Sequence, residues 1–322
     1  MTCARLFLPS SHVALLIDKG DDFPPAFEAT LSSFNPEMTW FRARTGKTTR
    51  AVNVYSGTAV GEGHQSFRYL TPQKQLFLKD LLLPPSPFAA PLPPEWIHVV
   101  CNTTRARSIA DEMDQIREDG IEGVGKGWKG RLVWEPLPSA CVPEELETVK
   151  ALAPHFAVIS PNLLELQSLL SLPLEHSRTQ VEHAAHLFHT HLSTPSLSNQ
   201  DTTHQAIPAI VVRSGELGSY TLSSNWLGWI PAYWRASESH RVVDPTGGGN
   251  GFLGGLCAGL MLSDGDLKVA SIYASTAASF AIQQKGLPTI EAGERELWNG
   301  DNVWDRLAEM ADRVEDASSL SS

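Results

Sequence analysis

The sequence predicts an α/β protein with a largely parallel sheet, on two observations. Short apolar runs, rich in β-branched and aromatic residues, alternate with longer segments whose apolar residues recur every three or four positions. The short runs end in Pro, Gly, Asn or Asp, which is typical of buried strands. This alternation favours a parallel sheet that helices cover on both faces, with ligands bound at the carboxyl ends of the strands.

The expected elements follow this alternation along the chain. Strands are expected at residues 12–18, 95–102, 130–136, 155–162 and 207–215, with a further strand after Gly218. Helices are expected at 108–120, 143–153, 163–172 and 179–192. Later in the chain we expect a strand at "SHRVV" (239–243) and buried helices at 251–262 and 272–286.

Residues 39–70 break the alternation. Their short aromatic and β-branched pieces are separated by glycines and show no helical period, so we expect a small antiparallel lid. The predicted division of the chain is residues 1–38 as the start of the α/β body, 39–82 as the lid-like β segment, 83–94 as a Pro-rich linker, 95–310 as the main α/β body and 311–322 as a disordered tail.

Composition narrows the classes of partner. The 322 residues carry a formal net charge of −11, which disfavours sequence-independent binding to nucleic acid, because that binding depends on Lys and Arg. No uninterrupted apolar stretch reaches the roughly 20 residues that a membrane span needs. The four cysteines are scattered without a C-x-x-C pair, which predicts reduced thiols and a cytoplasmic location. We therefore expect small-molecule or protein partners.

Two motifs suggest chemistry that their spacing does not support. "GKTT" at 46–49 lacks the first glycine of a P-loop, since Phe41 stands five residues before Gly46, and we expect an exposed basic turn. Histidines occur at 183, 186, 189 and 191, and the first three are spaced to share a helical face, but no carboxylate or cysteine at ligand spacing completes a metal site. A solvent-facing helix with incidental histidines is the favoured interpretation.

The segment "DPTGGGNGFLGG", residues 244–255, is the strongest candidate site. Free amides at the start of the helix that follows, together with the positive end of the helix dipole, form an anion site that consecutive glycines let a phosphate approach. Gly249, Gly251 and Gly254 also satisfy the dinucleotide pattern G-x-G-x-x-G, which would indicate an oxidoreductase, but no strand with a ribose-binding acid follows. A purely structural glycine turn is the third interpretation.

Other strand ends favour a phosphate site at the same sheet edge. In "SPNLLE", Asn162 follows a strand and Glu165 lies in the first turn of the next helix, where its carboxylate can face a hydrated metal ion. Another strand ends in Ser214 and turns at Gly218 into the next strand. The small residues of 272–286 leave a helix face that could receive a flat base.

This order of motifs resembles the PfkB or ribokinase family of carbohydrate kinases. From about residue 95 to 290, P-N-x-x-E, S-G-x-x-G, D-x-T-G-x-G-x and a small-residue helix ending in glycine are similar to that family in order and spacing. "LLIDKGDDFPPAF" (15–27) resembles its G-x-D-x-x-G neighbourhood, and the opening is most similar to the fungal killer-maintenance branch. The resemblance implies a three-layer ribokinase-like fold with a mostly parallel central sheet and a small antiparallel lid. It also implies transfer of the γ-phosphoryl group of ATP to a sugar alcohol.

The resemblance assigns a role to each candidate residue. The anion hole would be Gly247, Gly248 and Gly249, with Asn250 at the position of the catalytic base. The nucleotide would contact Ser214, Gly215, Gly218, Ala277 and Gly286. Magnesium and phosphates would be organised by Asn162 and Glu165 without direct ligation of the metal, and a monovalent-ion loop would contain Asp244 and Thr246. The implied cofactors are ATP and Mg²⁺.

Two departures from the family pattern decide the functional expectation. The family signature ends in Asp where this chain has Asn250. An amide does not accept a proton near neutral pH, and the general-base catalysis that is lost is worth about 10²- to 10⁴-fold in rate. By the same resemblance, we expect the family's opening strand, with its sugar-binding acid, to be missing, through either natural shortening or a truncated reading frame. We expect a nucleotide-binding pseudokinase with a regulatory role. The alternative is an active ATP-dependent kinase of a small sugar or nucleoside-like alcohol, and the lid is the expected surface of any homodimer.

Overall fold

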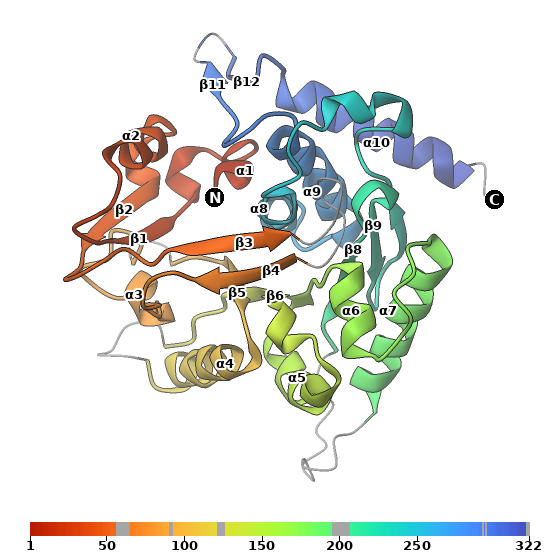
Figure 1. Cartoon of the computed structure of the whole chain (residues 1–322), viewed down its shortest axis with the longest axis horizontal. Helices are drawn as coiled ribbons and strands as arrows, with labels where there is room; N and C mark the ends of the chain where they lie inside the picture. The colour runs from red at the N-terminus through yellow and green to blue at the C-terminus, as the bar shows by residue number, and fades with distance from the viewer. Residues whose placement is uncertain are drawn as a thin grey trace.

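The computed structural model describes residues 1–55, 65–89, 93–120, 126–194, 207–291, 293 and 295–319 (Figure 1). Its central feature is a six-stranded sheet of order β10-β9-β8-β7-β6-β5. The strands are β5 (Trp96–Cys101), β6 (Arg131–Pro136), β7 (Val158–Ile159), β8 (Ala209–Arg213), β9 (Ser219–Leu222) and β10 (Leu227–Ile230). Strands β5 to β8 pair in parallel, whereas β8, β9 and β10 pair antiparallel. The prediction of a mostly parallel sheet is confirmed.

Helices cover both faces of this sheet (Figure 1). One layer contains α4 (Thr103–Glu118), α5 (Leu146–Leu152), α6 (Leu163–Leu169) and α7 (Arg178–Ser193). The other contains α8 (Gly248–Leu262) and α9 (Leu267–Ile282), against which α1 (Thr2–Arg5) and α10 (Val303–Ser319) pack. Successive residues of a strand point to opposite faces, so Leu132 and Trp134 of β6 join the core under α4 to α7, while Val133 joins the core under α8 and α9. The predicted three-layer architecture is confirmed.

The segment before the sheet forms two separate strand pairs. β1 (Leu15–Lys19) pairs in parallel with β2 (Thr39–Ala43) across α2 (Pro25–Ser33), and β3 (Ala51–Tyr55) pairs antiparallel with β4 (Gln65–Tyr69) before α3 (Leu78–Leu82). The expected antiparallel lid therefore holds for β3 and β4, but the expectation is wrong for residues 39–43. Because a helix connects β1 to β2, the crossover returns the chain in the same direction and makes the pair parallel.

The expected strand at 239–243 is absent. Residues Ala236–Arg241 form a 3₁₀ helix, and the N–H of Val243 donates to the carbonyl of Ile282 at the end of α9 at 2.9 Å. Val242 and Val243 are 37% and 51% exposed, so their β-branched side chains do not join the core that a strand here would need. The segment instead connects β10 to the glycine-rich start of α8.

The predicted tail is helical over most of its length. α10 continues to Ser319, because Met310 and Val314 are buried against Ile230, Tyr233 and Ile272 and give the helix an apolar face. Residues 320–322 lie outside the described part of the chain. Short elements complete the fold: η1 (Ser10–His12), η2 (Pro36–Met38), η3 (Pro138–Ala140), η4 (Pro143–Glu145), η5 (Ala153–His155), η6 (Gly215–Leu217), β11 (Ile290–Glu291) and β12 (Leu297–Trp298). Across the described ranges, no helix combines the length and the apolar character needed to cross a membrane.

Candidate functional site

The start of α8 has the backbone geometry of an anion site. Gly247 caps the helix with a left-handed φ of 86°, which favours glycine. The N–H of Gly248 donates to Pro245 at 3.0 Å and that of Gly251 to Gly247 at 2.7 Å. Among the described residues, no acceptor is recorded for the N–H groups of Gly249 and Asn250. These two amides, at the positive end of a 15-residue helix, are available to a ligand.

The three glycines have different surroundings. A Cβ on Gly247 would meet nothing within 4 Å, whereas one on Gly248 would lie 2.8 Å from Cγ2 of Ile282. A Cβ on Gly249 would overlap Nη1 of Arg213, so this glycine is required by the close approach of a side chain. Gly247 and Asn250 are exposed, which leaves the start of the helix open to solvent.

The loop before α8 is held by a local hydrogen bond. Oδ1 of Asp244 accepts from the N–H of Thr246 at 2.9 Å. This hydrogen bond lowers the pKa of the half-buried Asp244 carboxyl, so the residue is ionised at neutral pH. The structure thus places both predicted loop residues directly before the start of α8.

Arg213, at the end of β8, is the centre of a buried charge cluster beside the glycines. Its Nη1 lies 2.9 Å from Oε1 of Glu135, and its Nη2 lies 3.7 Å from Oε2 of Glu165 and donates to the carbonyl of Ser160 at 3.1 Å. Nε2 of His98 lies 2.9 Å from the other oxygen of Glu135. The side chains of Arg213, Glu135 and Glu165 are each 13% exposed. The guanidinium is therefore fixed between two carboxylates.

Burial and charge act differently on the two carboxylates. Burial opposes ionisation of Glu135, but Arg213 and His98 more than offset it, so the pKa of Glu135 is lowered. At Glu165 burial prevails, aided by the nearby Glu135, and Arg213 offsets only part of it, so the pKa of Glu165 is raised. In this cluster the ionised form of Glu135 is therefore stabilised, whereas that of Glu165 is destabilised.

Asn162 and Glu165 bond mainly to each other. Oδ1 of Asn162 accepts from the N–H of Glu165 at 2.8 Å, and Oε2 of Glu165 accepts from the N–H of Asn162 at 2.7 Å. This capping box fixes the first turn of α6. The N–H of Arg213 donates to Pro161 at 3.0 Å, which aligns Asn162 with Arg213 at the sheet edge.

Glu135 and Glu165 are poorly placed to bind a magnesium ion directly. Magnesium needs near-octahedral oxygen ligands, which proteins supply from one or two carboxylates together with phosphates and water. Here a guanidinium already lies between Glu135 and Glu165. Among the described residues, no group of three His, Cys, Asp or Glu side chains could hold a metal ion. Of the histidines of α7, His186 contacts a side chain of the sheet: its Nε2 lies 3.2 Å from the hydroxyl of Tyr220.

The turn after β8 lies next to the charge cluster in sequence. Gly215 and Gly218 have φ values of 56° and 95°, and a Cβ on Gly218 would collide with the backbone of residues 230–232. Ser214 is 3% exposed, and its hydroxyl is buried without a hydrogen-bond partner among the described residues. The structure therefore places Ser214, Gly215 and Gly218 beside Arg213.

The two residues predicted from α9 and its end differ in accessibility. Ala277 is fully buried, and its Cβ occupies the space where a Cβ on Gly255 would lie, so it packs α9 against α8 and does not face a ligand. Gly286 is exposed with a φ of 85° and follows the end of α9. Of the two, only Gly286 remains a candidate for contact with a nucleotide.

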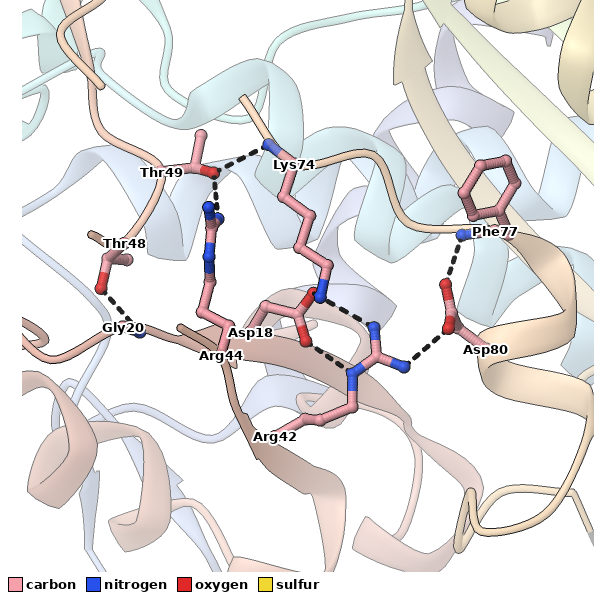
Figure 2. A network of polar contacts seen from close by, with 9 residues as sticks. All are labelled: Asp18, Gly20, Arg42, Arg44, Thr48, Thr49, Lys74, Phe77 and Asp80. Atoms are coloured by element: carbon pink, nitrogen blue, oxygen red, sulfur yellow. Dashed lines mark hydrogen bonds and ion pairs between the residues drawn. The ribbon is translucent and has the colours of Figure 1, made fainter. Parts of the chain in front are cut away.

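A second polar network joins the first strands to α3 (Figure 2). Asp18, whose side chain is 6% exposed, receives Nε of Arg42 at 2.6 Å and Nζ of Lys74 at 2.7 Å. Nη1 of Arg42 also reaches Asp80 at 2.6 Å, and Asp80 accepts from the N–H of Phe77 at 2.7 Å. The contacts of Arg42 with Asp18 and Asp80 fasten β1 and β2 to α3.

A cavity of about 490 Å³ lies apart from both clusters. Leu6, Trp298 and Trp304 supply its apolar lining, and Glu296 and Asp305 supply acidic groups. It contains none of the predicted site residues.

Glu135, Arg213 and His98 were not predicted from the sequence. A signal was present, since a charged residue closes each of two otherwise apolar strands, in "LVWEP" and "IVVRSG". Parallel strands align their carboxyl ends at one edge, so two such charges have a reason to meet there.

Comparison with known proteins supplies the family context. The family model described as "pfkB family carbohydrate kinase" matches residues 135–291. Protein MAK32 of Saccharomyces cerevisiae is 28% identical over 308 residues, which cover 92% of this chain and 78% of that protein. A nucleoside kinase of Methanocaldococcus jannaschii has a TM-score of 0.54 at 16% identity, covering 97% of this chain and 84% of that one. Fructokinase from Vibrio cholerae, solved with fructose, ADP and calcium, has a TM-score of 0.55 at 20% identity, covering 88% of this chain and 84% of that one.

Proposed function

The chain belongs to the PfkB/ribokinase-like family of carbohydrate kinases, and from that premise we propose that it binds ATP at the start of α8 with little or no phosphotransfer. The observation that carries the proposal is the pairing of an open glycine turn with an amide, Asn250, where a proton acceptor is needed. Phosphate oxygens would accept from the N–H groups of Gly249 and Asn250, in the field of the helix dipole.

The remainder of the nucleotide has candidate neighbours along the same sheet edge. Ser214, Gly215 and Gly218 form a turn whose glycines allow close approach of a ligand to the backbone. Gly286 adds an exposed turn after α9, and α9 itself is tied to the loop before α8 through Ile282. The fructokinase structure with ADP supports a nucleotide in a fold of this kind. A magnesium ion in this site would be held by the nucleotide's phosphates and by water.

The side chain at position 250 limits the chemistry. An acceptor hydroxyl must lose its proton as the phosphoryl group is transferred, and the amide of Asn250 does not take it near neutral pH. The backbone anion site does not depend on that side chain, so binding is retained when transfer is lost. A protein of this kind serves as a cytoplasmic nucleotide-dependent regulatory module, with the lid as the surface for a second copy. Retained transfer to a small sugar or nucleoside-like alcohol is the alternative.

Titration calorimetry with ATP and with NAD, in the presence of MgCl₂, tests the binding. We expect heat with ATP and none with NAD. The absence of ATP binding would contradict the proposal, and a preference for NAD would indicate an oxidoreductase.

A phosphotransfer assay with fructose, ribose and nucleosides as acceptors tests the chemistry. The variant Asn250→Asp restores a carboxylate, and we expect it to raise the transfer rate about 10²- to 10⁴-fold, the usual worth of general-base catalysis. Asn225→Asp makes the same change at an exposed position between β9 and β10 and serves as the matched control. Wild-type turnover that equals that of Asn250→Asp would instead establish the active-kinase alternative.

A further inference from the structure

A buried arginine lies at the positive end of α8. Its guanidinium occupies the space that a side chain on Gly249 would fill, which places it against the first turn of the helix. The amino end of a helix carries a partial positive charge, so a cation there is unfavourable unless negative charge lies close by. The arrangement therefore requires negative charge close to the guanidinium.

Two carboxylates of the protein supply this negative charge. Arg213 bridges Glu135 at 2.9 Å and Glu165 at 3.7 Å, and its Nη2 also donates to the carbonyl of Ser160. A cation held between two carboxylates beside a phosphate site is the arrangement that enzymes usually build around a divalent metal. In this chain the guanidinium of Arg213 occupies the position between the two carboxylates.

On the side of α8, the guanidinium lies against Gly249 in the first turn of the helix. Two further donors, Nε of Arg213 and the hydroxyl of Ser214, are buried without a partner among the described residues. Buried donors are nearly always satisfied in folded proteins, so these two groups leave unused hydrogen-bonding capacity beside the guanidinium.

We propose that Arg213 is a built-in cation that takes the place of a protein-bound divalent metal, so that phosphates of a nucleotide bind here without a strict need for magnesium. The inference rests on the proposed function, because it concerns the same site. Arg213 acts as a positioning residue: it compensates the ionised Glu135 and lies beside Glu165, so that negative charge in the cluster does not repel a phosphate. Without it, His98 would still contact Glu135, and an added metal ion would be needed to offset the remaining negative charge.

The first test compares ATP affinity by calorimetry in MgCl₂ and in EDTA. For the wild-type protein we expect removal of magnesium to weaken ATP binding by less than about 10-fold. For Arg213→Met we expect it to weaken binding about 10- to 100-fold more than in wild type, the usual worth of a charged hydrogen bond. Arg213→Lys keeps the charge and should resemble wild type. Arg131→Met makes the same substitution at the start of β6, the opposite end of the strands, and is the matched control.

The second test needs no nucleotide. Uptake of Mn²⁺, followed by its electron paramagnetic resonance signal, should be absent from this cluster in wild type and should appear in Arg213→Met, where the two carboxylates are free. Equal uptake by the two proteins would overturn the inference.

The two proposals fail in different ways. Binding of ATP that depends on magnesium by 100-fold or more in wild type, or to the same extent in wild type and Arg213→Met, overturns the role of Arg213 and leaves the nucleotide site intact. No ATP binding by wild type in MgCl₂ overturns the proposed function and this inference with it. The magnesium dependence of ATP binding by wild type needs only the wild-type protein, so this reading holds even if Arg213→Met fails to fold.

Discussion

Gly247 sets the backbone turn on which the anion site depends. Its φ of 86° is left-handed, which costs a residue with a side chain about 1–2 kcal/mol. The space around its missing Cβ is open, so backbone strain is the entire expected cost of a substitution. Gly300, between β12 and α10, has the same two properties, with a φ of 79° and nothing within 4 Å. The two positions form a matched pair.

Replacing either glycine by alanine should lower the free energy of unfolding by a similar amount, about 1–2 kcal/mol, as measured by urea denaturation. Only Gly247→Ala should also weaken ATP binding, because relief of strain at this residue turns the amides of Gly249 and Asn250 away from a common point. Equal ATP affinities in Gly247→Ala and Gly300→Ala would show that the turn does not hold the phosphates.

For single residues, the sequence predicted the glycine turn at the start of α8 better than it predicted the charged residues beside it. Asn250 and the glycines were predicted at the helix start because positive-φ turns have few alternatives to glycine. Arg213 and Glu135 were missed, because a charged residue after an apolar run is equally typical of a strand that ends in solvent. Ala277 was misassigned, since small residues that pack two helices and small residues that face a flat base have the same pattern. Such distinctions depend on contacts between distant segments.

Among the elements, β1 and β2 depend on a polar clasp more than on a shared core. Arg42 of β2 joins Asp18 of β1 to Asp80 of α3, and Lys74 reaches Asp18 from the loop before α3 (Figure 2). Burial would raise the pKa of Asp18, but hydrogen bonds from Arg42 and Lys74 prevail and lower it. The folded protein therefore stabilises the ionised form.

Arg42→Met should lower the free energy of unfolding by roughly 1.5–3 kcal/mol at pH 7, the usual worth of hydrogen bonds to a charged group. Because the folded pKa of Asp18 lies below its ordinary value of about 3.8, this stabilisation is present above that value and is lost as the pH falls through the folded pKa. Urea denaturation at pH 7 and near pH 3 should thus show the difference between wild type and variant shrinking on acidification.

The matched control for this clasp is Lys47→Met. Lys47 pairs with Asp21 at 3.6 Å, but the two side chains are 60% and 65% exposed, so the loss should be about 0–1 kcal/mol. A difference between wild type and Arg42→Met that stays constant with pH would contradict the assigned role of Asp18.

The strands that the sequence predicted correctly have a local pattern that only one kind of element explains. Buried parallel strands need continuous apolar runs, and β6 and β8 have them. The segment 239–243 has two valines as well, but its backbone N–H groups find partners at the end of α9 and not in the sheet. Local composition does not reveal where a hydrogen-bond partner lies, so the strand was predicted and a 3₁₀ turn formed.

For the whole molecule, α10 ties the last layer to the loop that leads into the candidate site. Arg306 donates to Ser279 of α9 at 3.1 Å and stacks over Phe280 at 3.9 Å. The hydroxyl of Tyr233, in the connection after β10, donates to Glu309 at 2.6 Å. The connection between β10 and the glycines is therefore held between α9 and α10, and its position depends on the end of the chain.

A chain that stops after Met310 tests this dependence. It loses the buried Val314 and the hydrogen bond from Arg313 to the carbonyl of Tyr233, which together are worth about 2–4 kcal/mol. We expect its urea midpoint to fall accordingly and its ATP affinity to fall with it, because the loop before Gly247 loses support. The exposed Glu315, in the same helix, provides the control: Glu315→Ala should change stability by no more than about 0.5 kcal/mol. If the shortened chain unfolds at the wild-type midpoint, residues 311–319 do not stabilise the fold, whatever their helical form, and the loop before the site is held by α9 alone.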